Sequence, residues 1–321
     1  MRRMVSLLIL AVTLCISNSI SDVLTADENQ LVPDDCFDVC TSQSDCFHGW
    51  DAGAELLIVR PYISLDHGVQ WSESYEEGDT EYSNRSAPQY GYEASPRIWL
   101  GYTGCHGFGL RTRWWSLDQE SEVLKTNPDE HEFDEIGTTF STLALDVIDM
   151  EMTFRDHFCQ WNLLSSAGLR YARIDFFSSD RNEYEWGDNL YLETTKFESY
   201  GPTVAIEARR QFCCGLTPYV IARGSLLAGN HNFVRDHKDY DESNDDDYDT
   251  RRFAEITHTI ELQIGAELCR ETPYGDLVMG VALEGQFWNR VGAMFDSSSD
   301  QEEDHMHMFV AGGVLTFGIR R

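Results

Sequence analysis

Residues 255–268, EITHTIELQIGAEL, decide the fold because their polarity alternates at every second position. One face carries isoleucine, leucine and alanine together with His258, and the other carries glutamate, threonine, glutamine and glycine. This period of two is that of a β-strand, in which successive side chains point to opposite faces of the sheet. Such a strand is far longer than the five or six residues that are usual in soluble sheets.

The same alternation recurs along the chain and predicts ten strands in all. In two of them the apolar positions change phase: in LALDVIDMEMTF they are odd up to Val147 and even from Met150, and in LRYARIDF they shift near Ala172. We interpret both changes as β-bulges. The ten strands are predicted near residues 50–61, 95–103, 107–117, 139–154, 161–177, 197–210, 216–228, 254–268, 276–290 and 306–319.

The connections between these strands alternate between short and long. The four short connections hold Cys105, Cys159, the pair Cys213 and Cys214, and Cys269. The long connections hold 31 of the 55 acidic residues but only five of the 24 basic ones, in the segments 72–82, 118–137, 178–195, 231–251 and 296–305. Most of the net charge of −31 therefore lies at one end of the strands.

An open meander of this length would leave two unpaired edges and an apolar face without a solvent. Closure into a barrel inside a bilayer removes both problems, and barrels of this kind place short turns in the periplasm and long loops outside the cell. We therefore predict an all-β transmembrane antiparallel up-and-down β-barrel of about 10 strands, with short periplasmic turns and long acidic extracellular loops. A soluble β-sandwich is the alternative. Twelve strands remain open if YISLDHGVQW, residues 62–71, pairs with a neighbouring loop segment.

The N-terminus has the layout of an export signal, with Arg2 and Arg3 before an apolar run and small residues up to Ala26. We expect a cleaved signal peptide over 1–26, a cysteine-bearing periplasmic segment over 27–49 and the barrel over 50–321, in the outer membrane. The mature chain would keep eight cysteines, an even number that in an exported chain favours disulfides over a metal site. We expect no metal or cofactor, and disulfides that tie the periplasmic segment to the turns from among Cys36, Cys40, Cys46, Cys105, Cys159, Cys213, Cys214 and Cys269.

The polar faces of the strands carry both signs of charge, and we assign them to the lumen. Trp99 and Trp115 also point inward by their position in the alternation. Two interpretations stay open: a constriction that sorts solutes by charge, or salt-bridged pairs that fill a narrow interior. The lumen candidates are Glu55, Arg97, Arg111, Arg113, Asp146, Glu151, Arg170, Arg173, Glu207, Arg209, Arg223, Glu261, Glu267 and Glu284.

An ordered series of strand segments resembles the Legionella-type major outer membrane protein family from residue 50 to the C-terminus. It includes WDAGAELLIVRP (50–61), SPRIWLGYTG (95–104), YGPTVAIEARRQF (200–212), IELQIGAEL (260–268) and LEGQFWNR (283–290). The resemblance implies a porin-like barrel that forms a pore in the outer membrane. The chain departs from the family in its cysteine-bearing turns, its acidic loops and its LTFGIRR end, which lacks a terminal aromatic residue.

The acidic balance argues against nucleic acid as a partner and favours cations at the loop end. We predict passive, cation-preferring passage of ions or small hydrophilic solutes. The alternative is a non-conducting structural or adhesive barrel whose acidic loops bind a partner. Loose divalent binding by Asp239, Asp241, Asp245 and Asp247, and a homo-oligomer, stay open. We expect no enzyme, because no GxSxG motif is present and no serine is clearly placed beside His258.

Overall fold

The computed structural model describes residues 49–65, 71–76, 79–84, 88–121, 124–126, 136–158, 161–184, 187–210, 216–239, 247–295 and 303–321. These residues contain no helix with the length and apolar character that crossing a membrane requires. Ten long strands form the main sheet: β1 (Gly49–Leu65), β4 (Glu93–Thr103), β5 (Phe108–Glu120), β7 (Ile136–Phe158), β8 (Trp161–Tyr184), β9 (Gly187–Arg210), β10 (Leu216–Asp239), β11 (Asp247–Thr272), β12 (Gly275–Phe295) and β13 (Glu303–Arg320).

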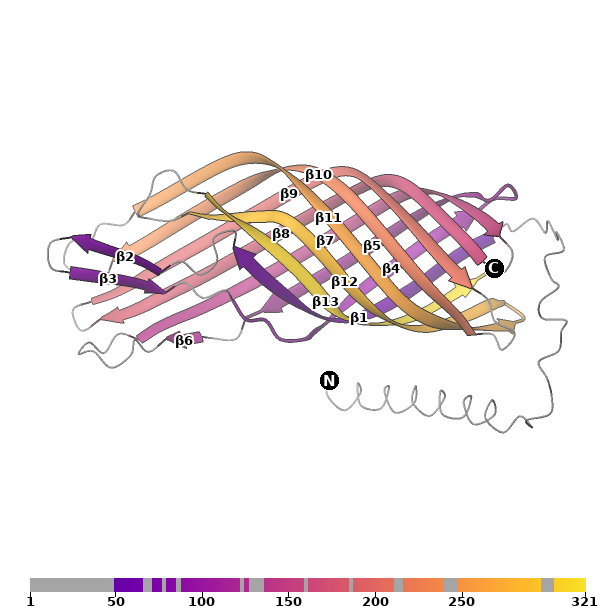
Figure 1. The fold of residues 1–321 in the computed structure, drawn as a ribbon, viewed down its shortest axis with the longest axis horizontal. Helices are drawn as coiled ribbons and strands as arrows, with labels where there is room; N and C mark the ends of the chain where they lie inside the picture. The colour runs from indigo at the N-terminus through magenta and orange to yellow at the C-terminus, as the bar shows by residue number, and fades with distance from the viewer. Residues whose placement is uncertain are drawn as a thin grey trace, which may run out of the picture. The chain divides into compact units, whose positions relative to one another are not determined.

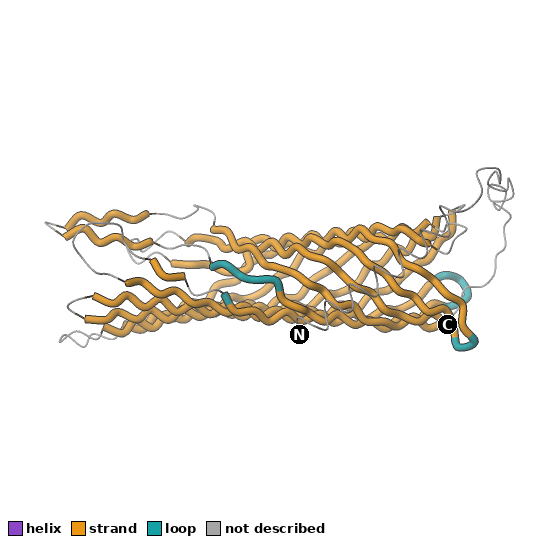
Figure 2. Tube along the Cα trace, turned by 90° about the horizontal axis from the view of Figure 1, so that it is seen from below, coloured by secondary structure: helices purple, strands orange, loops and turns teal. Residues whose placement is uncertain are grey.

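The sheet is a closed antiparallel ring in which each strand pairs with its neighbour along the chain (Figures 1 and 2). The ring closes where β13 pairs with β1, from Asp51 opposite Arg320 to Leu65 opposite Met306. The three-residue β6 (Leu124–Thr126) only extends the edge of β7, while β5 itself pairs with β7. The prediction of a ten-stranded up-and-down barrel is confirmed.

The segment that left twelve strands open adds no strand to the barrel, and a separate hairpin begins at its last residue, Trp71. β2 (Trp71–Glu76) and β3 (Asp79–Asn84) make a two-stranded sheet of their own. Residues 62–65 belong instead to the end of β1. The barrel therefore keeps ten strands, and the hairpin lies at the end with the long connections (Figure 1).

Both predicted bulges are wrong. β7 pairs with β8 without a break from Ile136 opposite Glu183 to Phe158 opposite Trp161, and β8 pairs with β9 in one continuous register. A register shift occurs in β12 instead, between Trp288 and Gly292, where Arg290 has a φ of 54°. The change of phase in the sequence must therefore have another cause.

The cause is an exchange of polarity between the two faces of the barrel partway along the strands. In β7 the odd residues face inward throughout, but Leu143, Leu145 and Val147 are apolar whereas Asp149 and Glu151 are charged. We call the strand halves next to the short turns the turn-side section and those next to the long connections the loop-side section. The boundaries lie between residues 147 and 148 in β7, 171 and 172 in β8, 199 and 200 in β9, 226 and 227 in β10, and 255 and 256 in β11.

The turn-side section has an apolar outer face and a polar interior. In β11, Ile256, Ile260 and Ile264 are more than half exposed, whereas Thr259 and Glu261 between them are buried. This arrangement is the reverse of a soluble protein and matches a barrel whose outer face contacts lipid. The exposed apolar residues of the other strands here include Ile148, Met150, Met152, Phe154, Leu169, Tyr171, Val204, Ile206, Val220 and Leu226.

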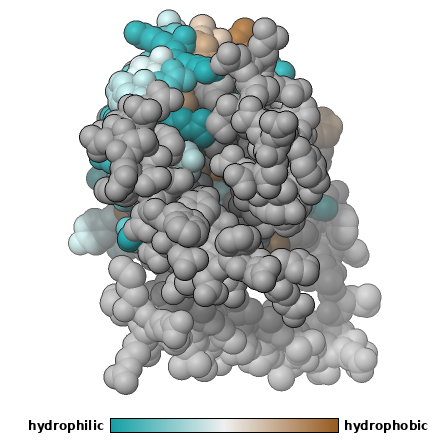
Figure 3. Space-filling view, turned by 90° about the vertical axis from the view of Figure 1, so that its left-hand side faces the viewer, coloured by the Kyte–Doolittle hydropathy of each residue, from teal (hydrophilic) through white to brown (hydrophobic). Residues whose placement is uncertain are grey.

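The loop-side section has the opposite arrangement, a polar outer face around an apolar interior. Asp146, Lys196 and Glu198 are exposed on its outer face. Figure 3 looks onto this end, where the described residues that reach the surface are mostly hydrophilic. Inside, one cluster of buried side chains includes Leu57, Val59, Trp115, Leu117, Leu143, Leu145, Ile174, Phe176, Phe197, Leu227, Trp288, Met306 and Met308.

Candidate functional site

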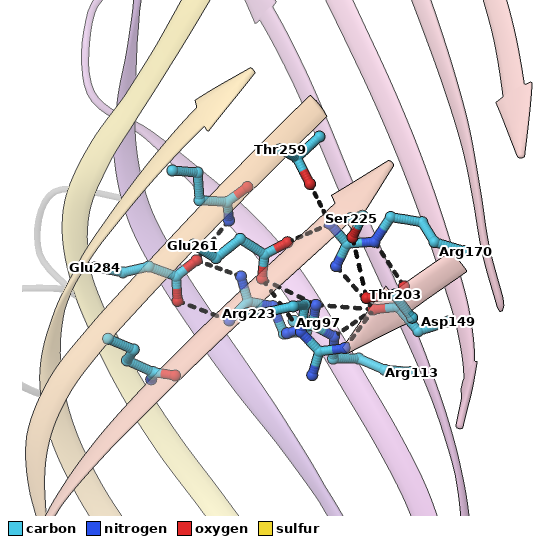
Figure 4. Close-up of polar contacts among 12 residues, drawn as sticks. Arg97, Arg113, Asp149, Arg170, Thr203, Arg223, Ser225, Thr259, Glu261 and Glu284 are labelled. Carbon is cyan, nitrogen blue, oxygen red and sulfur yellow. Dashed lines mark hydrogen bonds and ion pairs between the residues drawn. The ribbon is translucent and has the colours of Figure 1, made fainter. Parts of the chain in front are cut away.

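The interior of the turn-side section is a layer of ion pairs centred on Asp149 (Figure 4). This carboxylate from β7 is fully buried and accepts hydrogen bonds from three strands. Arg170 donates through Nε at 2.7 Å and Nη2 at 3.1 Å, and Arg113 donates through Nε at 2.9 Å. Arg223 Nη1 lies 3.4 Å away, so the one carboxylate joins β5, β8 and β10.

Glu261 from β11 completes this centre from the opposite wall. Its carboxylate lies 2.5 Å from Arg170 Nη1, 3.0 Å from Arg113 Nη2 and 3.6 Å from Arg223 Nε. Arg223 also pairs with Glu151. Because these side chains are buried away from water, each charge is tolerated only while it is paired with groups of opposite charge. We call Asp149, Glu151, Glu261, Arg113, Arg170 and Arg223 the ionic layer.

A second group of ion pairs lies beside this layer, on β1, β4 and β12. Arg97 donates to Glu284 at 2.7 Å and to Glu55 at 2.9 Å, while its guanidinium lies 5.5 Å from the ring centroid of Trp115. Arg97 and Glu284 are both buried. The ion pairs thus join strands around the barrel wall and also connect side chains across its axis. They therefore hold several strands together.

The interior of the loop-side section also holds buried polar side chains, among them Glu193 and His231. The ring of His231 is fully buried and stacked between Phe197, at 4.1 Å between centroids, and Phe253, at 4.9 Å. Its Nε2 lies 3.2 Å from Glu255, which in turn lies 3.3 Å from Nδ1 of His305. The section also holds the ion pair of Arg235 and Glu193 at 3.2 Å, so its largely apolar interior includes a few charged groups.

A cavity of about 410 Å³ opens at the turn end of the barrel. Gly49 at the start of β1, the C-terminal Arg321 and Gly275 of the β11–β12 turn line its mouth. Arg97, Arg113 and Arg223 line its inner end, where the two groups of ion pairs begin. We call this cavity the vestibule.

Twelve of the fourteen lumen candidates lie inside the barrel, and two do not. Asp146 and Arg173 are exposed on the outer face of the loop-side section, where Arg173 pairs with Asp175 at 2.8 Å. Both were assigned inward because the apolar face was taken as the outer one along the whole strand. The twelve inside are Glu55, Arg97, Arg111, Arg113, Glu151, Arg170, Glu207, Arg209, Arg223, Glu261, Glu267 and Glu284.

Sequence reasoning missed several interior charges, namely Asp51, Asp149, Arg155 and Arg320 in the turn-side section and Glu193, Arg235 and Glu255 in the loop-side section. Asp149 stands two residues before Glu151 and so has the same inward phase, but the supposed bulge fell between Val147 and Met150 and hid it. Arg155 and Arg320 lie near strand ends, where alternation gives little information. The two tryptophans predicted to point inward do so: Trp99 donates to Asp51 at 2.9 Å and Trp115 to Ser95 at 2.6 Å.

Few of the predicted disulfide positions can be compared with the structure. Cys105 and Cys269 have free thiols. The other six candidates, Cys36, Cys40, Cys46, Cys159, Cys213 and Cys214, lie outside the described residues, as do Asp241 and Asp245. Asp239 ends β10 and Asp247 begins β11. No group of three or more His, Cys, Asp or Glu among the described residues is arranged to hold a metal ion.

His258 lies on the outer face, as its position in the alternation suggested. Its Nδ1 is 3.2 Å from the amide of Asn289, and its ring centroid is 6.4 Å from that of Phe287. The side chain therefore has an amide and an aromatic neighbour on the wall of the barrel.

Of three solved structures, one reaches a TM-score of 0.50 and shares this fold. The Escherichia coli outer membrane protease OmpT has a TM-score of 0.50 at 9% identity, over 85% of this chain and 97% of that chain. The Pseudomonas putida toluene transporter TodX has a TM-score of 0.32 at 6% identity, covering 84% and 89%. A Pseudomonas aeruginosa FadL homologue has a TM-score of 0.27 at 9% identity, covering 85% and 90%. No curated protein matches the sequence.

The family comparison is more specific than these likenesses of fold. Residues 44–316 match the model of the Legionella pneumophila major outer membrane protein precursor, which is most of the chain. This match agrees with the ordered series of strand segments and with the lipid-facing outer wall of the turn-side section. The chain therefore belongs to the Legionella major outer membrane protein family and is an outer-membrane β-barrel.

Proposed function

We propose that the chain is a sealed outer-membrane barrel that anchors and displays its acidic loop end, rather than a channel along the barrel axis. The observation that supports this proposal is the filled interior. A ten-stranded barrel lies between eight-stranded barrels, which side chains fill, and barrels of sixteen strands or more, which leave a channel. Here large side chains occupy the axis.

Two barriers of different chemistry lie in series along that axis. The ionic layer crosses the turn-side section beyond the vestibule, and its charges are already neutralised by one another. The apolar cluster fills the loop-side section, with Trp288 and Leu145 buried in it. A hydrated ion that passed the first barrier by exchanging partners would still have to lose water in the second, which is costly.

The loop segments then become the functional surface. They carry most of the acidic residues of the chain and few basic ones. A field of one sign attracts positively charged partners over about one Debye length, roughly 8 Å at physiological salt. A cationic partner surface or divalent cations that bridge the loops are the ligands that fit this charge.

Passive passage of cations is the second candidate, and the vestibule favours it. A blind cavity that already reaches Arg97 and Arg223 would become part of a channel if the ion pairs beyond it rearranged. The acidic loops would then favour cations over anions at the outer mouth. This candidate requires both barriers to open.

Conductance across a planar bilayer distinguishes the two. We expect purified, folded protein to give no steady current at low voltage, since both barriers are closed. A matched variant, Trp288→Ala with Leu145→Ala, hollows the apolar barrier and serves as the reference for partial opening. Steady, cation-selective channels of the unmodified protein would overturn the sealed-barrel proposal in favour of passage.

A further inference from the structure

The vestibule has a charge pattern that the sealed barrel does not explain. Its volume of about 410 Å³ is within the range of small-molecule sites, roughly 300–1,000 Å³. It opens at the turn end, on the periplasmic side of an outer-membrane barrel. Arginines are prominent in its lining, in a chain that carries 31 more acidic than basic residues.

Near its mouth, three arginines share two glutamates. Glu207 pairs with Arg111 and, at 2.6 Å, with Arg209. Glu267 lies 3.4 Å from Arg209 and 3.0 Å from Arg320. Arg111 also pairs with Glu151 of the ionic layer at 2.8 Å, so each of the three arginines in this row already has a carboxylate partner.

Arg155 adds a further positive charge beside this row. Within the described part of the chain, no carboxylate lies at ion-pair distance from its guanidinium, although its side chain is partly buried and lines the vestibule. Arg209 and Arg320 are close enough to repel it. The neighbouring carboxylate of Asp51 already accepts the indole N–H of Trp99 at 2.9 Å.

Arg155 is also held in place by the backbone. Its N–H donates to the carbonyl of Gly107 at 2.8 Å, which ties the end of β7 to the β4–β5 turn. Gly107 has a φ of 80° and a Cβ there would meet the carbonyl oxygen of Arg155 at 2.5 Å, so the close approach needs a glycine. The guanidinium is thus presented to the cavity from a fixed strand end.

We propose that the vestibule binds a small phosphate-bearing anion, whose oxygens accept hydrogen bonds from Arg155, Arg209 and Arg320. The planar guanidinium presents paired N–H groups that match the oxygens of a phosphate. Such a ligand supplies a negative charge to Arg155, which has no carboxylate at ion-pair distance among the described residues. The site goes beyond the sealed-barrel function and does not depend on it, because the ligand enters from the periplasmic mouth and need not cross the barrel.

Titration of the full-length protein with inorganic phosphate tests the site. Calorimetry in octyl glucoside, a detergent without phosphate, is expected to show one saturable site per chain. Arg155→Gln should weaken the affinity at least tenfold, because it removes a charged donor pair. Arg173→Gln, on the outer face of the adjacent strand, is the matched control and should leave the affinity unchanged.

Heat-modifiable electrophoretic mobility shows whether each variant still forms the barrel. Arg155→Gln is expected to fold, since it relieves repulsion between arginines. Absence of saturable phosphate binding by the folded protein, or equal affinity of the folded Arg155→Gln variant, would overturn the site.

The phosphate could belong to a soluble ester or to a lipid headgroup, and nanodiscs separate the two. If the source is a soluble anion, sn-glycerol 3-phosphate should bind equally in phosphatidylcholine and phosphatidylglycerol nanodiscs. If lipid headgroups occupy the site, phosphatidylglycerol should abolish the binding of the free ester. Equal binding supports the soluble source, and its selective loss assigns the site to lipid.

Discussion

Asp146 and Asp149 are the same residue type, three positions apart on one strand, yet they have opposite surroundings. Asp146 is exposed on the outer face, whereas Asp149 is fully buried among three arginines. Because the two residues are an odd number of positions apart, their side chains point to opposite faces of the sheet. At the scale of the residue, position in the alternation therefore decides whether a carboxylate is dispensable or structural.

We predict that Asp149→Asn destabilises the folded barrel by about 3–5 kcal/mol, because it leaves buried arginines without their shared charge. Asp146→Asn is the control and should change the free energy of unfolding by less than about 0.5 kcal/mol. Urea unfolding of protein folded into phospholipid vesicles measures both. Equal stability of the two variants would show that the ionic layer does not support the fold.

Alternation alone predicted most of the interior charges, because an inward polar residue on a long strand has no other face to occupy. It failed for Asp146, Arg173 and Asp149, which lie close to the boundary between the two sections. There the sequence shows which residues share a face but not which face contacts water. Which face contacts water depends on whether lipid or water surrounds the barrel at that height. The sequence of a single strand does not carry this information.

At the scale of the element, β7 shows again that alternation does not reveal which face contacts water. It has 23 residues and an unbroken register with β8, yet its apolar residues are on the inner face in one half and on the outer face in the other. A local insertion was the simplest explanation of this pattern from sequence. The structure shows instead that one regular strand runs from a part of the wall that faces lipid into a part that faces water.

We predict that the outer face of β7 tolerates a lysine in one section and not in the other. Met150→Lys, in the turn-side section, should cost about 2–4 kcal/mol of folding free energy, since the charge would contact the apolar part of the bilayer. Ala144→Lys, on the same face in the loop-side section and opposite Asp175, should be nearly neutral. Denaturant titrations in vesicles compare the two. A similar cost for both variants would mean that the lipid boundary is not at residues 147–148.

At the scale of the whole molecule, the strands are longer than a membrane requires. About 9–11 residues per strand suffice to cross a bilayer, whereas β8, β9 and β10 each have 24 residues and β11 has 26. The number and order of strands followed from the sequence because each has its own alternation. The strands proved longer than predicted because their polar outer halves resembled loops.

We predict that the barrel projects about 30 Å from the bilayer on the loop side. The loop-side sections of β8, β9 and β10 have about 13 residues each, and a section of that length, rising about 3.3 Å per residue at a tilt of about 45°, reaches about 30 Å along the axis. Atomic force microscopy of reconstituted membranes measures this height. A projection of only a few ångströms would contradict the division into two sections.

The exchange of polarity also fixes the depth at which the barrel sits. A shift outward would lift Ile148 and Met150 from hydrocarbon into water, and a shift inward would carry Asp146 and Arg173 into hydrocarbon. Both displacements would raise the free energy, so the polarity of the outer wall sets the position of the barrel in the bilayer. The protein can hold its level against tension or thinning of the surrounding lipid without a separate anchor, and its loop end keeps a constant distance from the membrane.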